Sequence, residues 1–156
     1  MRRKDREVTD NSKIKEIINS CQCCRIGFND NGSIYIVPLN FGYIYENDCY
    51  TIYFHSAKEG RKIDLIQNSP NVGFEMDTGY KLHTAELACN YSAGFQSIIG
   101  NGTVEIVNDT DEKIRGLSLL MEHNTGKKDW HFDERMTNAV TVFKLTVTEL
   151  SCKEHL

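Results

Sequence analysis

The chain has 156 residues, which is the size of one compact domain and leaves little room for a second. Its 22 acidic and 18 basic residues give a formal net charge of −4, which argues against binding duplex DNA or an anionic membrane through bulk positive charge. With 40% hydrophobic and 10% aromatic residues, the composition also disfavours a disordered protein. We therefore expect one folded domain over residues 1–156, with any basic site confined to a small part of its surface.

The N-terminus begins with a basic segment, Arg2 to Arg6, that has the charge of a secretion signal. The apolar segment that should follow is missing, because polar residues 9–12 come next. No stretch approaches the roughly 18 consecutive apolar residues that cross a bilayer. We expect a cytoplasmic protein whose six cysteines are reduced thiols.

The hydrophobic pattern starts with a helix and then becomes mostly extended. Asp10 can cap a helix in which Ile14, Ile17 and Ile18 recur at helical spacing. Alternating and β-branched segments predict strands, and two further segments predict helices. The predicted elements are strands over 24–28, 34–39, 41–45 and 49–55, a short helix over 58–68, strands over 71–76, 82–89 and 95–107, a helix from 109 to about 121, a polar loop over 124–133 and a last strand over 139–149.

Turn and kink signals divide these strands. Residues 29–32 (Asn-Asp-Asn-Gly) form a strong turn signal, and Pro38 marks a bulge, an edge or the end of strand pairing. Gly100 and Gly102 predict kinks in the long strand over 95–107. Many antiparallel strands with few helices favour a small β-barrel with helical flanks.

Several residues resemble parts of metal-binding, nucleotide-binding or hydrolase motifs, but their spacing does not match those motifs. Cys21 and Cys24 have the C-x-x-C spacing, but no second ligand pair for zinc follows, and structural thiols are favoured. The glycines lack the spacing of a dinucleotide turn or a P-loop, and Ser97 lacks the frame of a hydrolase nucleophile. The histidines are scattered, and Trp130 suits burial or ligand stacking equally. We predict no metal site.

One segment, residues 53–62, combines groups that suit a phosphate. A strand ends in His55 and Ser56, a short loop follows, and Arg61 and Lys62 lie in the first turn of a predicted helix. The exposed N–H groups and the dipole at a helix start favour an anion. Arginine adds planar bidentate contacts and lysine adds a point charge. The alternative is that these basic residues only solvate the start of the helix.

The same segment carries a resemblance to a known family. Residues 36–43 (IVPLNFGY) and 54–57 (FHSA) with 60–62 (GRK) closely resemble the nitroimidazole-resistance (Nim) proteins, within the pyridoxamine-phosphate-oxidase-like, FMN-binding split-barrel superfamily. The segments 68–70, 74–77, 89–92 and 97–102 continue the likeness, which covers nearly the whole chain.

This resemblance implies a six-stranded antiparallel split β-barrel that forms a homodimer, with FMN in two clefts at the interface. It assigns residues of one strand to the isoalloxazine and ribityl chain, the end of the next strand to the flavin, and two basic residues to the phosphate. The implied cofactor-binding residues are Tyr35, Ile36, Val37, Pro38, Leu39, Asn40, His55, Ser56, Ala57, Arg61 and Lys62, with Ser97 from the partner subunit and Trp130 as a flavin-facing residue.

Two departures separate the chain from true pyridoxamine-phosphate oxidases. The first flavin strand ends in Asn40 where those enzymes have lysine, and Trp130 is followed by His131 rather than arginine. The resemblance therefore implies an FMN-dependent oxidoreductase that reduces small planar acceptors such as 5-nitroimidazoles, with His55 as the candidate catalytic group. The alternatives are a non-catalytic flavin-binding or redox-sensing protein, or the same fold with haem or another phosphate-bearing cofactor.

Overall fold

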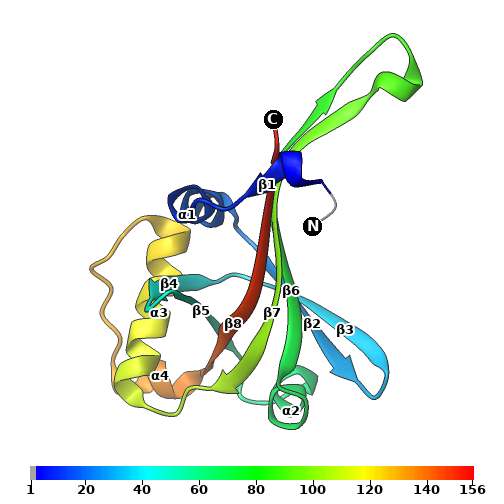
Figure 1. Cartoon of the computed structure of the whole chain (residues 1–156). Helices are drawn as coiled ribbons and strands as arrows, with labels where there is room; N and C mark the ends of the chain where they lie inside the picture. The colour runs from blue at the N-terminus through cyan, green and yellow to red at the C-terminus, as the bar shows by residue number, and fades with distance from the viewer. Residues whose placement is uncertain (1–2) are drawn as a thin grey trace.

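The computed structural model describes residues 3–156 as a twisted antiparallel β-sheet with helices packed on it (Figure 1). The strands are β1 (Glu7–Val8), β2 (Cys24–Asp30), β3 (Ser33–Leu39), β4 (Gly42–Glu46), β5 (Cys49–Ser56), β6 (Asn71–His83), β7 (Ser92–Ile106) and β8 (Thr141–His155). The helices are α1 (Asn11–Ser20), α2 (Arg61–Asn68), α3 (Thr110–Thr125) and α4 (Glu134–Ala139), with short 3-10 turns η1 (Lys4–Arg6) and η2 (Ala88–Asn90). The predicted mainly β split barrel with flanking helices is confirmed.

The strands follow the order β3-β2-β6-β7-β8-β5-β4, and β1 pairs with β8. The sheet thus has eight strands where the family resemblance implied six. One additional strand is the two-residue β1. The other arises because strand pairing is interrupted at Asn40: β3, before it, pairs with β2, and β4, after it, pairs with β5. Because β3 lies at one end of the order, Pro38 falls on an edge strand, as one of the predicted alternatives required.

The main hydrophobic core fills the concave side of the sheet. In β2 the alternate residues Cys24, Ile26 and Phe28 are fully buried in it. Two helices pack on the same core, each through an apolar face at helical spacing. These faces are Ile14, Ile17 and Ile18 of α1, and Ile63, Leu65 and Ile66 of α2. Packing of α2 by this face leaves its first residues, Arg61 and Lys62, at the edge of the barrel.

Helix α3 lies on the outer side of β4, β5 and β8, where it covers a second, smaller core (Figure 1). Two glycines allow the close approach. A Cβ atom on Gly42 would collide with the backbone of Leu119 and Leu120, and a Cβ on Gly116 would lie 2.7 Å from the Tyr53 ring. The helix begins with a cap, because the Asp109 carboxylate accepts from the Glu112 amide at 2.8 Å.

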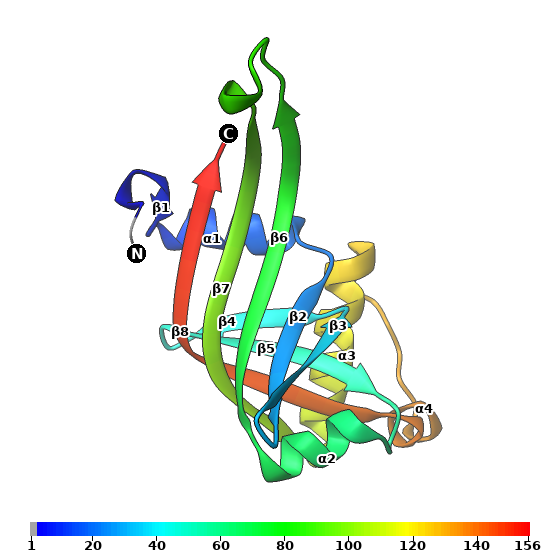
Figure 2. The ribbon, with the colours of Figure 1, turned by 90° about the vertical axis from the view of Figure 1, so that its right-hand side faces the viewer.

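Several segments differ from the sequence-based prediction. Strand β6 runs to His83, so the strand predicted over 82–89 is correct only at Leu82 and His83, which pair with β7; residues 84–89 are unpaired and form a loop that leads into η2. Figure 2 shows that the β6–β7 hairpin projects beyond the rest of the sheet. The short helix α4 was not predicted; Asp133 caps it, and β8 therefore begins at Thr141 rather than at 139.

The ladder between β7 and β8 is irregular at Gly102, one of the two predicted kink positions. The register shifts between Asn101, which pairs with Glu149, and Gly102, which pairs with Val147, so Thr148 of β8 is the extra residue. A side chain on Gly100 would collide with the Glu149 carbonyl oxygen and lie 2.6 Å from the Phe74 ring. Within residues 3–156, no helix is both long and apolar enough to span a membrane.

Candidate functional site

The predicted phosphate site lies in the loop that connects β5 to α2 and at the start of that helix. Strand β5 ends at Ser56, and α2 begins at Arg61. Between them Gly60 has φ 125°, a conformation that L side chains rarely adopt, and no side chain caps the helix. The Ile63 N–H bonds the Gly60 carbonyl oxygen, so the N–H groups of Arg61 and Lys62 are the first-turn donors left for an external acceptor, which favours an anion at this position.

Arg61 is held in a fixed position beside this helix start. Its Nε and Nη2 atoms donate to the same Asp30 carboxylate oxygen, at 2.8 and 2.5 Å. Its guanidinium carbon lies 4.3 Å from the centre of the Tyr35 ring. The guanidinium thus contacts a carboxylate at one edge and an aromatic face below, and its Nη1 group has no partner in the described chain.

Lys62 is a half-buried cation that no carboxylate neutralises. Within residues 3–156 it forms no ion pair, and its Nζ lies 5.9 Å from the centre of the Phe143 ring. Burial lowers the pKa of Lys62 below its ordinary value, because it disfavours the charged form. A bound anion would supply the missing counter-charge. The ammonium, the free guanidinium edge, the Ser56 hydroxyl and the uncapped helix start are donors of the kinds that bind a phosphate monoester.

His55 and Ser56 lie side by side at the end of β5, on opposite faces of the strand. Their backbones pair with Val142 and Thr141 of β8, respectively. The His55 side chain is exposed, and neither ring nitrogen has a hydrogen-bond partner in the part of the chain that the structure describes. Ser56 is partly buried, and Ala57 is exposed in the loop that follows. The predicted histidine is therefore accessible to a ligand at the rim of the barrel.

Strand β3 supplies the long side of the candidate site. It pairs with β2 along one edge only, so the backbone groups on its other edge are free to bond a ligand. Its side chains alternate: Tyr35, Val37 and Leu39 pack on the core, whereas Ile36 and Pro38 face outward and are exposed. The Asn40 side chain already has a hydrogen-bond partner in its own chain, because its Nδ2 donates to the Asn124 side-chain oxygen at 3.1 Å.

Two predicted residues do not join this site within one chain. Ser97 pairs across the sheet with Asp77 and Lys153. Asp77 bonds Arg25 near the start of β2, whereas Arg61 bonds Asp30 at its end, so the two regions are roughly 17 Å apart along the strand. The indole Nε1 of Trp130 donates to the Lys127 carbonyl oxygen at 3.0 Å, in a loop of its own, and the side chain is 38% exposed.

Asp30 is the site residue that sequence reasoning missed. It falls within the Asn-Asp-Asn-Gly turn signal, which accounted for it without assigning a further role. Only the packing of the β2–β3 hairpin against α2 brings it to Arg61, 31 residues later in the chain. A sequence signal that could have found it is the position of an acidic residue directly at a strand end.

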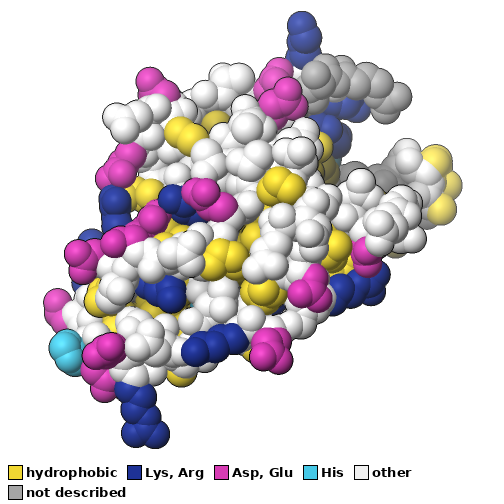
Figure 3. Space-filling model, turned by 90° about the horizontal axis from the view of Figure 1, so that it is seen from below, with side chains coloured by type: hydrophobic (Ala, Val, Ile, Leu, Met, Phe, Trp, Pro, Cys, Tyr) yellow, Lys and Arg dark blue, Asp and Glu magenta, His cyan; other side chains and the backbone are white. Residues whose placement is uncertain are grey.

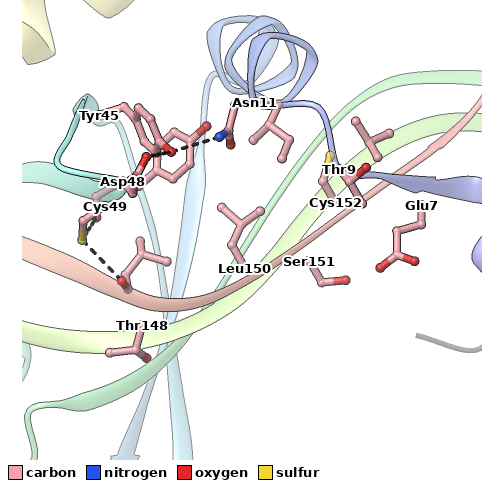
Figure 4. Close-up of a pocket in the computed structure, with 14 residues that line it drawn as sticks. Glu7, Thr9, Asn11, Tyr45, Asp48, Cys49, Thr148, Leu150, Ser151 and Cys152 are labelled. Carbon is pink, nitrogen blue, oxygen red and sulfur yellow. Dashed lines mark hydrogen bonds between the residues drawn. The ribbon is translucent and has the colours of Figure 1, made fainter.

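Two other cavities carry the wrong charge for a phosphate. A hollow of about 520 Å³ beside Arg61 is lined by the carboxylates of Asp30 and Asp64. A cavity of about 330 Å³ lies between β1, α1, the β4–β5 hairpin and β8, and its charged lining residues are Glu7 and Asp48 (Figure 4). None of the predicted cofactor residues lines this second cavity. The phosphate side of Arg61 is therefore the one that faces away from Asp30.

Within residues 3–156, the cysteines and the possible metal ligands do not form a second site. Burial raises the pKa of the Cys21 thiol to about 12 and that of Cys152 to about 11, which suits structural rather than reactive thiols. Among the described residues no three histidine, cysteine or acidic side chains gather as metal ligands. Figure 3 shows basic and acidic side chains interspersed over the face that it presents, without a continuous basic patch.

Comparison with known proteins identifies what the chain is similar to. A family model described as pyridoxamine 5'-phosphate oxidase matches residues 10–154. A crystal structure of a proposed 5-nitroimidazole antibiotic resistance protein from Bacteroides thetaiotaomicron is 35% identical, with a TM-score of 0.79. The match covers 94% of this chain and 85% of that one. These findings confirm the resemblance on which the sequence-based prediction rested.

More distant structures share the fold alone. The flavocytochrome Anf3 from Azotobacter vinelandii is 21% identical with a TM-score of 0.80, over 100% of this chain and 72% of that one. The FAD- and heme-binding protein from Mycobacterium smegmatis is 12% identical with a TM-score of 0.81, over 96% and 73%. No curated protein sequence matches the chain.

Proposed function

Because the chain belongs to the pyridoxamine 5'-phosphate oxidase family, we propose that it binds FMN and acts as an oxidoreductase of the Nim type. The observation that carries the FMN proposal is the site at the start of α2. An unneutralised, half-buried Lys62 and the free edge of Arg61 adjoin an uncapped helix start. A flavin that carries a terminal phosphate monoester satisfies all three groups at once, which riboflavin cannot do.

The other predicted residues have complementary roles along the cleft. The free edge of β3, over Tyr35 to Asn40, provides backbone groups for the flavin ring and ribityl chain. Ser56 ends β5, Ala57 follows in the loop, and His55 is an exposed imidazole at the same strand end. When bound, FMN supplies the redox chemistry; the protein binds it, orients it and limits the access of water.

The partner in this proposal is a second copy of the chain. Ser97 and Arg61 lie near opposite ends of β2 within one chain, which supports a site that a second copy completes. A homodimer would let the partner subunit contribute Ser97 to the cleft. Exposed Ile34, Ile36 and Ile99 lie on the outer face of the sheet, where a second copy would bury them.

The proposal for the electron acceptor rests on the 35% identical structure from Bacteroides thetaiotaomicron. That protein is described by resistance to 5-nitroimidazole antibiotics, which supports a small planar nitroaromatic as the acceptor. A second candidate function is a flavin-binding or redox-sensing protein without turnover, which the same cofactor site would serve. The fold relatives that bind haem support a third candidate, a haem-binding barrel.

The test of the phosphate site compares two ligands that differ only in the phosphate. We expect Arg61→Ala and Lys62→Ala each to weaken FMN binding about tenfold or more, since each removes a charge-assisted bond, and to change riboflavin binding little. Titration of the apoprotein with each flavin measures both constants. Lys58→Ala, a nearby exposed cation in the same loop, is the control. Equal losses for FMN and riboflavin would contradict the phosphate assignment.

A turnover experiment separates the enzyme from the non-catalytic binder. The FMN-loaded protein is reduced anaerobically with NADH and then mixed with a 5-nitroimidazole. We expect reoxidation faster than that of free FMN, and a slower rate in His55→Ala. Reoxidation no faster than that of free FMN would favour the binder over the oxidoreductase.

A further inference from the structure

The contacts of Arg61 raise a question that the phosphate site alone does not answer. A residue assigned to an anionic ligand already bonds an anion of its own chain, through Nε and Nη2 to one oxygen of Asp30. Asp30 could therefore compete with the phosphate for Arg61, or it could hold Arg61 ready for the phosphate. The two roles predict opposite effects when the carboxylate is removed.

The geometry favours the second role. Both bonds go to one carboxylate oxygen from the Nε side of the guanidinium, so the Nη1 group at the opposite edge stays free. The Tyr35 ring, 4.3 Å from the guanidinium carbon, restricts motion out of the plane. An arginine side chain has many rotamers, and a ligand that must order it loses affinity. Here two neighbours have already ordered it.

Charge also favours this role over competition. The Asp30 side chain is 21% exposed and offsets the charge of Arg61, but Lys62 remains without a carboxylate partner within residues 3–156. The site therefore keeps a net attraction for an anion even with the Asp30–Arg61 pair intact. The hollow beside the pair is lined by Arg61 and by the carboxylates of Asp30 and Asp64, whose two negative charges make it less favourable for an anion.

We propose that Asp30 and Tyr35 are positioning residues that hold Arg61 with its free edge toward the flavin phosphate and so set the preference for FMN over riboflavin. This inference rests on the proposed FMN site. It assigns Asp30, an acidic residue, a favourable effect on the binding of an acidic ligand. A charge-based estimate that ignored the bonds would give the opposite sign.

The experiment measures the dissociation constants of FMN and riboflavin for matched carboxylate variants. We expect Asp30→Ala to weaken FMN binding about tenfold while riboflavin binding stays within twofold. Asp30→Asn should recover part of the loss, because its amide oxygen can still accept from Arg61. The control is Asp64→Asn, which removes a charge from the same hollow but breaks no bond to Arg61. We expect it to leave FMN binding unchanged or slightly tighter.

A double-mutant cycle shows whether Asp30 acts through Arg61. In an Arg61→Ala background, we expect Asp30→Ala to cause no further loss of FMN affinity. Tyr35→Leu should weaken FMN binding about threefold with Arg61 present and have a smaller effect without it. Thermal unfolding of each variant verifies that the barrel is intact.

Two results would overturn the inference. Tighter FMN binding by both Asp30→Asn and Asp64→Asn would show that Asp30 acts only through its charge. An undiminished loss in the Arg61→Ala background would show that it acts through the fold. Failure of the FMN site itself would look different, because the unmodified protein would then show no preference for FMN over riboflavin.

Discussion

At the scale of single residues, the candidate site depends on two cations in different environments. Arg61 is exposed and held by Asp30 and Tyr35, whereas Lys62 is half-buried and has no carboxylate partner among residues 3–156. Arginine keeps its charge at all accessible pH values, but a buried lysine can lose its proton. The two residues should therefore respond differently to pH.

The lowered pKa of Lys62 predicts a pH-dependent preference for FMN. A phosphate beside the ammonium favours the charged form, so binding raises this pKa again and takes up a proton wherever the free protein has lost it. FMN affinity should stay high below the pKa of Lys62 in the free protein and fall as the pH rises through it. Titrations from about pH 8 to about pH 10.5 measure this.

Riboflavin and one variant serve as controls for this effect. Riboflavin binding should show no matching decline, and Lys62→Arg should remove the decline in FMN binding, because arginine stays charged. An FMN affinity that is independent of pH over this range, or a parallel decline for riboflavin, would mean that Lys62 does not contact the phosphate.

The sequence alone predicted both cations but not what fixes them. Arg61 and Lys62 could be found because a strand end, a short loop and a helix start are local features of residues 53–62. Asp30 could not, because its bond to Arg61 depends on how a distant hairpin packs against α2. Whether His55 transfers a proton is still a prediction.

At the scale of elements, the local signals that predicted helices were their caps. Asp10 accepts from the Lys13 amide and Asp109 from the Glu112 amide, both at 2.8 Å, as the sequence pattern required. Asp133 caps α4 in the same manner, but the polar loop around it concealed a helix of only six residues. The strand predicted over 82–89 ends at His83 in the structure. A strand needs a pairing partner, and the local sequence does not specify where that partner ends.

Close packing of α3 on β4 gives a prediction about stability. Gly42→Ala would place a methyl group against the backbone of Leu119 and Leu120, and backbone atoms cannot turn aside. We expect a loss of about 1–3 kcal/mol in the free energy of unfolding, measured by urea denaturation. The control is Ser118→Ala on α3, whose hydroxyl bonds only the Ile114 carbonyl of its own helix. Equal stabilities of the two variants would show that α3 does not approach β4 this closely.

At the scale of the whole molecule, the fold followed from the family resemblance more than from residue patterns. The patterns favoured a small barrel with helical flanks, and the resemblance specified the split barrel. The sheet order could not be derived from local signals, because β2 pairs with β6 and β5 with β8 across long stretches of chain. The proposed assembly concerns the same sheet, on its outer face.

The homodimer proposal predicts a mass and a variant that changes it. The unmodified protein should sediment at twice the 17.9 kDa mass of the chain. Ile36 is 61% exposed on the outer face of β3, so Ile36→Lys would bury a charge in the proposed interface. We expect it to weaken dimerisation at least tenfold and FMN binding with it. Met136→Lys, at a position on α4 that is 55% exposed, should leave both unchanged. A monomeric unmodified protein that still binds FMN would contradict the shared site.

The visible absorption spectrum of the purified protein, with the released chromophore identified by mass, tests the central proposal most directly. We expect a flavin spectrum and the mass of FMN, or, for protein purified without cofactor, micromolar binding of added FMN that exceeds that of riboflavin. A haem Soret band in place of flavin would contradict the account, as would the absence of a chromophore together with no micromolar FMN binding.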